Sequence, residues 1–179
     1  MIIEELEALE KESLGRGIPI VGRHKGSWLY KKILEVKPKK VLELGTANGY
    51  SGIIIGSTGA KLFTIEIDNQ IAGEAKNNFS KFGIDATVIV GDGVLEVKKI
   101  AEEKKNLGSF GIIFIDFAKG KYISVLEDCI KLVNKGGFII ADNITFQGCQ
   151  GYRAAVLNHP KLKTEIIDIK DGMACSERL

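Results

Sequence analysis

The sequence predicts an α/β fold built on a doubly wound, mostly parallel sheet, and three observations support this prediction. Short β-rich runs alternate with helical patterns along the chain. Most of these runs are apolar on both faces, as strands covered by helices on each side are. The chain has 179 residues, which matches about one domain at ~150 residues per domain. We therefore expect a single domain over residues 1–179.

The central part of the chain predicts five strands and four helices. The expected strands are residues 40–44, 62–66, 87–90, 110–115 and 137–141. The expected helices are residues 50–57, 69–82, 95–105 and 122–133. In the last of these helices the apolar residues recur at three- and four-residue spacing, which predicts one buried stripe. The sequence Lys135-Gly136-Gly137 is expected to end that helix.

The two ends of the chain differ from this alternation. Residues 1–35 are expected to be helical, with Ile2, Leu6 and Leu9 on one face and a second amphipathic segment at 27–34, so the sheet core spans 36–179. Near the C-terminus, residues 164–169 and 172–179 are two strand-like runs joined by Lys170-Asp171. That link is too short for a parallel crossover, so the two runs predict an antiparallel hairpin at the sheet edge.

The charge balance excludes a strongly basic, non-specific nucleic-acid binder. The 25 basic and 23 acidic side chains leave a net charge of only +2. The lysines are nevertheless clustered, between positions 31 and 40, 98 and 105, 119 and 121, and 161 and 163. We interpret these clusters as solvated surface, with an RNA-binding surface as the alternative.

The cysteines and the apolar runs indicate the compartment. Cys129, Cys149 and Cys175 are far apart and form no CxxC pair, which favours free thiols in a reducing environment. No apolar run approaches the ~18 residues needed to cross a bilayer. We therefore expect a cytoplasmic protein with no membrane partner.

A glycine-containing loop follows the first expected strand. It reads GTANGYSG from Gly45 to Gly52. A dinucleotide-binding loop would have the pattern GxGxxG, but here Ala47 stands where its middle glycine would be, which favours a ligand without a pyrophosphate against the helix start. Glu66 ends the second strand, where a carboxylate can accept hydrogen bonds from both hydroxyls of a ribose. The pattern predicts a nucleoside-containing ligand.

Oxygen-bearing side chains follow the fourth and fifth strands. Asp116 ends one and Asp142-Asn143 ends the other. A single such aspartate is often a helix cap, but three residues at two neighbouring strand ends favour a site for Mg²⁺, or for Mn²⁺ or Ca²⁺. Lys119 lies three residues after Asp116. Beside a divalent cation its neutral form is favoured, so it is a candidate general base.

Five motifs in order carry a resemblance to a known family. They are VLELGTANGYS, TIEID, VGDG, IDFAKGKY and GGFIIADN. Together they resemble the cation-dependent O-methyltransferases of the catechol and caffeoyl-coenzyme A type. The resemblance implies the Rossmann-like class I methyltransferase fold, S-adenosylmethionine as cofactor, a metal at Asp116, Asp142 and Asn143, and Lys119 as the catalytic base.

The resemblance also implies which residues contact the cofactor. Glu43, Gly45 and Ser51 match contacts to the methionine end, and Glu66 matches the ribose ligand. Asp92 and Gly93 match the loop on the adenine side, and Val21 matches a segment that closes over the methionine moiety. The full expected set is Val21, Glu43, Gly45, Ser51, Glu66, Asp92, Gly93 and Asp116.

The acceptor and the assembly are less defined. A small catechol-like hydroxyl is the first expectation, and a hydroxylated wobble uridine of tRNA is an alternative that the lysine clusters keep open. A non-catalytic nucleotide-binding domain is an alternative of another class, against which the joint presence of Asp116, Lys119, Asp142 and Asn143 argues. The resemblance further implies a homodimer.

Overall fold

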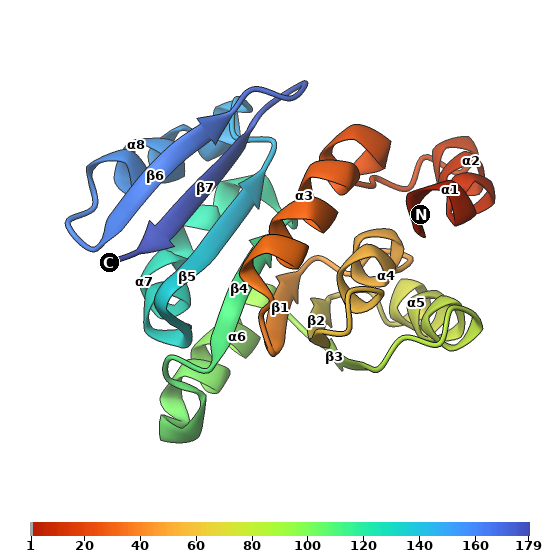
Figure 1. The fold of residues 1–179 in the computed structure, drawn as a ribbon, viewed down its shortest axis with the longest axis horizontal. Coiled ribbons are helices and arrows are strands. Elements are labelled where there is room, and N and C mark those ends of the chain that lie inside the picture. Colours follow the sequence, from red (N-terminus) through yellow and green to blue (C-terminus); the bar gives the residue numbers. More distant parts are fainter. Residues whose placement is uncertain (1) are drawn as a thin grey trace.

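Residues 2–179, which the computed structural model describes, form a seven-stranded sheet with helices on both faces (Figure 1). The strands are β1 (Lys40–Leu44), β2 (Lys61–Glu66), β3 (Ala86–Val90), β4 (Phe110–Ile115), β5 (Val133–Asp142), β6 (Leu162–Ile167) and β7 (Met173–Arg178). The helices are α1 (Ile2–Glu5), α2 (Glu7–Gly15), α3 (Gly22–Val36), α4 (Tyr50–Gly56), α5 (Asn69–Lys81), α6 (Gly93–Glu102), α7 (Tyr122–Leu132) and α8 (Gln150–Asn158). The short 3₁₀ turns are η1 (Lys104–Asn106), η2 (Lys119–Lys121) and η3 (Gln147–Cys149).

The sheet confirms the predicted mixed topology. Its strand order is β3-β2-β1-β4-β5-β7-β6. Strands β1 to β5 pair in parallel, whereas β7 pairs antiparallel with both β5 and β6. The C-terminal hairpin therefore extends the sheet beyond β5, with β7 inside and β6 at the edge. The strand order reverses between β1 and β4, which is where ligands bind in open α/β sheets.

Two apolar clusters hold the helices onto the sheet. Alternate residues of a strand face opposite sides, and in β1 Val41 packs with the cluster formed by α1 to α5 while Leu42 packs with the cluster formed by α6 to α8. Figure 1 shows α3, α4 and α5 on the near side of the central strands and α6 and α7 behind them. Since both faces are covered, the central strands are apolar on both sides, as the sequence predicts.

The predicted start of the fifth strand is wrong by four residues, although α7 ends within one residue of its predicted end. Helix α7 ends at Leu132, and β5 already begins at Val133, so Lys135-Gly136-Gly137 lies within a strand. The pairing shifts register between Phe110, which faces Val133, and Ile112, which faces Phe138. Gly136 has a φ of 74° at this irregularity, a conformation that glycine adopts without strain. Gly136 and Gly137 therefore lie in the irregular part of β5 and do not end helix α7.

Two helices differ from the sequence-based expectation. Helix α3 starts at Gly22, five residues before the predicted segment, because Lys25 and Gly26 continue its buried face. Because Lys25 is charged, the hydropathy of the sequence does not show that this position belongs to the buried face of the helix. Helix α8 was not predicted; among its residues only Tyr152 and Val156 are buried, and two positions give too weak a period.

The hairpin and the N-terminal segment agree with the predictions in type. The hairpin strands begin and end within two residues of the expected runs, and residues 2–36 are largely helical. The division of the chain into an N-terminal segment and a single core domain stays a prediction. No helix in the described part of the chain is long and apolar enough to cross a membrane.

The loops after β1 and β4 touch at the reversal point. Gly45 has a φ of 99°, and a Cβ atom built on it would lie 2.1 Å from the carbonyl oxygen of Asp116. The N–H of Asp116 donates to the carbonyl of Leu44 at 2.8 Å. The absence of a side chain at Gly45 is therefore what allows the two loops to lie against each other.

Gly45→Ala should destabilise the protein by about 3 kcal/mol or more, since it combines a backbone clash with a left-handed φ. Chemical denaturation monitored by circular dichroism measures the loss. Gly73→Ala is the matched control: Gly73 lies in α5 with no atom within 4 Å of the added Cβ. The control should be neutral or slightly stabilising, as alanine in a helix is. Equal stability of the two variants would contradict the proposed close approach.

Candidate active site

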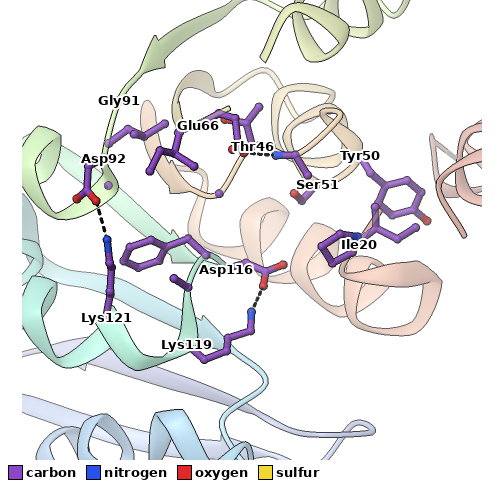
Figure 2. A pocket seen from close by; sticks show the side chains of 18 residues that line it. Ile20, Thr46, Tyr50, Ser51, Glu66, Gly91, Asp92, Asp116, Lys119 and Lys121 are labelled. Atoms are coloured by element: carbon purple, nitrogen blue, oxygen red, sulfur yellow. Dashed lines mark hydrogen bonds and ion pairs between the residues drawn. The ribbon is translucent and has the colours of Figure 1, made fainter. Parts of the chain in front are cut away.

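A cavity of about 300 Å³ opens at the carboxyl ends of β1, β2 and β4. Figure 2 shows Ser51, Glu66 and Asp116 around this space, with Ile20 at one end and Asp92 at the other. The residues predicted from the sequence that line it are Gly45, Ser51, Glu66, Asp92, Gly93, Asp116 and Lys119. The predicted cofactor residues are thus largely brought together by the fold.

Two predicted cofactor residues do not line the cavity. Val21 is only 5% exposed and packs in the apolar cluster formed by α1 to α5. Its neighbours Pro19 and Ile20 line the cavity instead, so the segment before α3 borders the site through different side chains. Glu43 is fully buried within β1.

Glu66 holds the glycine loop in shape. Its Oε2 accepts from the N–H of Ala47 at 2.9 Å, and its Oε1 accepts from the N–H of Asp68 at 3.0 Å. Ala47 has a φ of 45° at the place where GxGxxG would have its middle glycine, a backbone conformation that few residues other than glycine adopt. Each carboxylate oxygen retains acceptor capacity toward the cavity.

Glu43 is a buried carboxyl group with an incomplete set of partners. Its Oε2 accepts from Thr64 Oγ1 at 2.7 Å, and that hydroxyl also lies 2.6 Å from Thr46 Oγ1. Its Oε1 has no hydrogen-bond partner among residues 2–179. Burial raises the pKa of Glu43 to about 7. A buried acceptor without a donor is unfavourable unless a ligand supplies one.

Asp92 and Gly93 form the far end of the cavity. Asp92 caps α6, with its Oδ1 accepting from Val94 N–H at 2.9 Å, and its Oδ2 lies 2.6 Å from Lys121 Nζ. The hydrogen bond from Lys121 holds the pKa of Asp92 below its usual range. A Cβ at Gly93 would lie 3.0 Å from the ring of Phe117, so that ring closes the wall here.

The predicted oxygen ligands lie at the ends of β4 and β5. Lys119 Nζ donates to Asp116 Oδ1 at 2.6 Å and to the Tyr122 hydroxyl at 3.0 Å (Figure 2 shows the first of these). Asp142 is 2% exposed and its Oδ1 accepts from the N–H of Asn143 at 2.7 Å. Burial, followed by the nearby charge of Asp116, raises the pKa of Asp142 to about 6. The two carboxylates are therefore close enough to act on each other.

Each of these three residues keeps one side-chain oxygen free. Within the described chain no donor reaches Asp116 Oδ2, Asp142 Oδ2 or Asn143 Oδ1. Residues 2–179 contain no group of three His, Cys, Asp or Glu arranged to hold a metal ion, so a cation here would need the amide of Asn143 as its third ligand. Carboxylate and amide oxygens fit Mg²⁺ by their chemistry.

Three residues at this site were missed in the sequence. Tyr122 is buried, and its ring stacks on Phe117 with centroids 5.6 Å apart. Lys25 is buried and bonds to the carboxylates of Asp142 and Asp171. Burial lowers the pKa of Lys25, but the hydrogen bonds with these carboxylates outweigh it and raise the pKa. A lysine inside an apolar stripe was the available signal, whereas Asp171 reads as an ordinary turn residue.

The N-terminal helix α2 also contributes to the site. Its Ser13 is fully buried and accepts a hydrogen bond from Asn48 Nδ2 at 2.7 Å. Asn48 belongs to the glycine loop, and its carbonyl accepts from Asn78 of α5 at 2.9 Å. The loop is therefore held from α2 and α5 as well as by Glu66.

Comparison with known proteins agrees with this site. Residues 2–179 match the model of a family described as O-methyltransferase. The chain is 34% identical to catechol O-methyltransferase B of Danio rerio over 152 residues, covering 80% of this chain and 57% of that protein. It is 28% identical to caffeoyl-CoA O-methyltransferase of Stellaria longipes, covering 81% of this chain and 63% of that protein. The chain thus spans less than two thirds of the length of either relative.

The fold matches solved structures over nearly the whole chain. One is the O-methyltransferase from Bacillus cereus in complex with SAH, with a TM-score of 0.86 and 22% identity, covering 99% of this chain and 90% of that one. A likeness at this identity speaks for the fold, and it confirms the predicted class I architecture. The match of residues 2–179 to the family model goes further, and by it this chain belongs to the O-methyltransferase family.

Proposed function

We propose that this protein transfers the methyl group of S-adenosylmethionine to a hydroxyl of a small, catechol-like acceptor in a Mg²⁺-dependent reaction. One observation carries the proposal. Asp116 borders the cavity that contains Glu66 and is also one of the three residues with a free ligand oxygen. A cofactor site and a cation site would therefore share a wall, which is the arrangement that methyl transfer to a bound oxygen needs.

The cavity fits the parts of S-adenosylmethionine. Glu66 would accept from the ribose hydroxyls, and Phe117, packed against Gly93, offers an apolar wall to the adenine. Glu43 is fully buried and does not line this cavity, but Ser51, which interacts with its carboxyl group, does line it and would offer its hydroxyl to the cofactor. When bound, the cofactor supplies an electrophilic methyl group on a sulfonium. The relative from Bacillus cereus was solved with SAH, which supports this choice of ligand.

The oxygen cluster fits a divalent cation. Asp116, Asp142 and Asn143 would hold it through their three free oxygens. A bound Mg²⁺ would stabilise the negative charge that develops on the acceptor oxygen. In its neutral form Lys119 Nζ would accept the acceptor's proton and become an ammonium, and its two contacts with Asp116 and Tyr122 fix where that nitrogen lies.

The positions of the lysines favour a small acceptor over tRNA. Lys40 and Lys61 open β1 and β2, and Lys104 and Lys105 lie directly before β4. All of these are at the amino ends of the parallel strands, whereas the cavity is at their carboxyl ends. These four lysines thus lie at the edge away from the site, whereas Lys119 and Lys121 line the cavity and would be the lysines beside a base that entered it.

The acceptor class and the cation requirement can be tested together. The protein is incubated with labelled S-adenosylmethionine and a catechol, a caffeoyl thioester or undermodified tRNA, with and without chelator. We expect transfer to a small hydroxyl acceptor that chelator abolishes and Mg²⁺ restores. Transfer that survives chelation would refute the metal role, transfer to tRNA alone would refute the acceptor class, and SAH binding without any transfer would favour the non-catalytic domain.

Lys119→Met should lower kcat by about 10²- to 10⁴-fold, the usual range for loss of a general base. Affinity for SAH, measured by titration calorimetry, should change little, because the cavity keeps its other walls. Lys131→Met is the matched control, since Lys131 lies on α7, forms a salt bridge with Asp128 and is not among the residues that line the cavity. A Lys119 variant with the activity of the control would exclude the base role.

Glu43→Gln should alter how stability depends on pH. The pKa of Glu43 is about 7 in the fold, against 4.5 ordinarily. Between these values the folded state holds the proton that the unfolded state has lost, so wild-type stability falls as pH rises from 5 to 8, by about 3 kcal/mol from this group. The variant lacks this decline. Denaturant midpoints at both pH values give the difference, and parallel profiles would contradict the buried carboxyl.

A further inference from the structure

Lys25 joins three separate parts of the fold beside the candidate metal site. Its side chain is 2% exposed, and its Nζ contacts the carboxylates of Asp142, at the end of β5, and Asp171, in the β6–β7 link. Lysine is almost never buried unless it is paired. The position of this ammonium is thus fixed by α3 on one side and by two carboxylates on the other.

Asp171 is fully engaged and cannot itself be a free ligand. Its Oδ1 accepts from Lys25, and its Oδ2 accepts from Asn143 Nδ2 at 2.6 Å. Because Asp171 holds the nitrogen end of the Asn143 amide, the oxygen end must face the other way. Asn143 has a φ of 54°, so its backbone is also held in a conformation that few residues adopt.

The same network selects one oxygen of Asp142. Both Lys25 Nζ and the N–H of Asn143 donate to Oδ1. Oδ2 receives no donor from the described residues. Two of the three candidate ligand oxygens are therefore oriented by contacts that run through Lys25 and Asp171.

We propose that Lys25 and Asp171 are positioning residues for the metal site, holding Asp142 and Asn143 with Oδ2 and Oδ1 directed at the cation. This inference rests on the proposed function, because it assumes a cation bound by Asp116, Asp142 and Asn143. Partners of this kind orient metal ligands, and their removal weakens metal binding by about 10- to 100-fold in well-studied sites.

A competing role for Lys25 predicts the opposite effect on metal affinity. The Lys25 ammonium could instead act as a resident positive charge that excludes a divalent cation from Asp142. Its removal would then strengthen metal binding. Lys25→Met therefore separates the two roles by the direction of the change.

The test measures Mn²⁺ binding to the whole chain without cofactor or acceptor, from the electron paramagnetic resonance signal of free Mn²⁺. Asp171→Asn, in a side chain that is 29% exposed, keeps the volume and the Lys25–Asp142 pair. We expect it to raise the Mn²⁺ dissociation constant at least about tenfold. Asp168→Asn is the matched control, because Asp168 is an exposed carboxylate in the same link with no side-chain partner among residues 2–179.

A second readout distinguishes positioning from general loosening. If the Asn143 oxygen leaves the cation in Asp171→Asn, a water molecule takes its place. The relaxation rate of water protons, which bound Mn²⁺ enhances, should then rise. The unfolding temperature and SAH affinity of this variant should stay at wild-type values. Lys25→Met leaves Asp142 unpaired and can fail to fold, in which case Asp171→Asn decides alone.

The outcomes separate this inference from the proposal on which it rests. No Mn²⁺ binding by the wild type would reject the metal site itself. Wild-type binding with an unchanged constant in Asp171→Asn would reject only the positioning role. Tighter binding by a folded Lys25→Met would also reject it, in favour of a competing ammonium. Weaker binding in Asp171→Asn, with the control unchanged, would support it.

Discussion

The close approach of the loops after β1 and β4 is the contact on which the site depends. A side chain at position 45 would clash with the Asp116 carbonyl, so glycine is needed there. The glycine loop therefore lies directly beside Asp116, the first candidate metal ligand. The cavity exists because the strand order reverses here, so that the two loops diverge toward different layers of helices. With a larger residue at position 45 the loops would separate, and the proposed cofactor and cation sites would no longer share a wall.

Several charged side chains lie close together at this site. Asp116, Asp142 and Asp171 would repel one another strongly if they were left unpaired at the carboxyl ends of the strands. Two lysines balance them in different ways: Lys119 from the same loop as Asp116, and the buried Lys25 from α3. Lys40 and Lys61, by contrast, begin β1 and β2 at the amino edge of the sheet. The small net charge of the chain therefore conceals a separation of roles between the two edges.

The agreement between sequence and structure varies with the range of the contact involved. Strands β1 and β4 match their predicted bounds. β4 is a nearly continuous apolar run, and β1 carries three apolar residues between turn-forming or charged neighbours, so each strand is marked by its own local sequence. The start of β5 was misjudged because glycines after a helix usually belong to its end, whereas here they lie within β5, where its pairing with β4 shifts register. Helix α8 was not predicted because only two of its side chains are buried, which is too few to give a helical period of apolar residues.

The sequence by itself determined the alternation of strands and helices, the glycine loop, and the placement of Glu66, Asp116 and Asp142 at strand ends, since each is encoded by neighbouring residues. Only the tertiary structure decided which groups meet. Lys25 and Asp142 are 117 positions apart, and Lys25 and Asp171 are 146 apart. Their meeting depends on how α3 packs across the sheet and how the hairpin turns back beside β5. No local sequence pattern predicts these contacts, because they depend on how distant segments pack against each other.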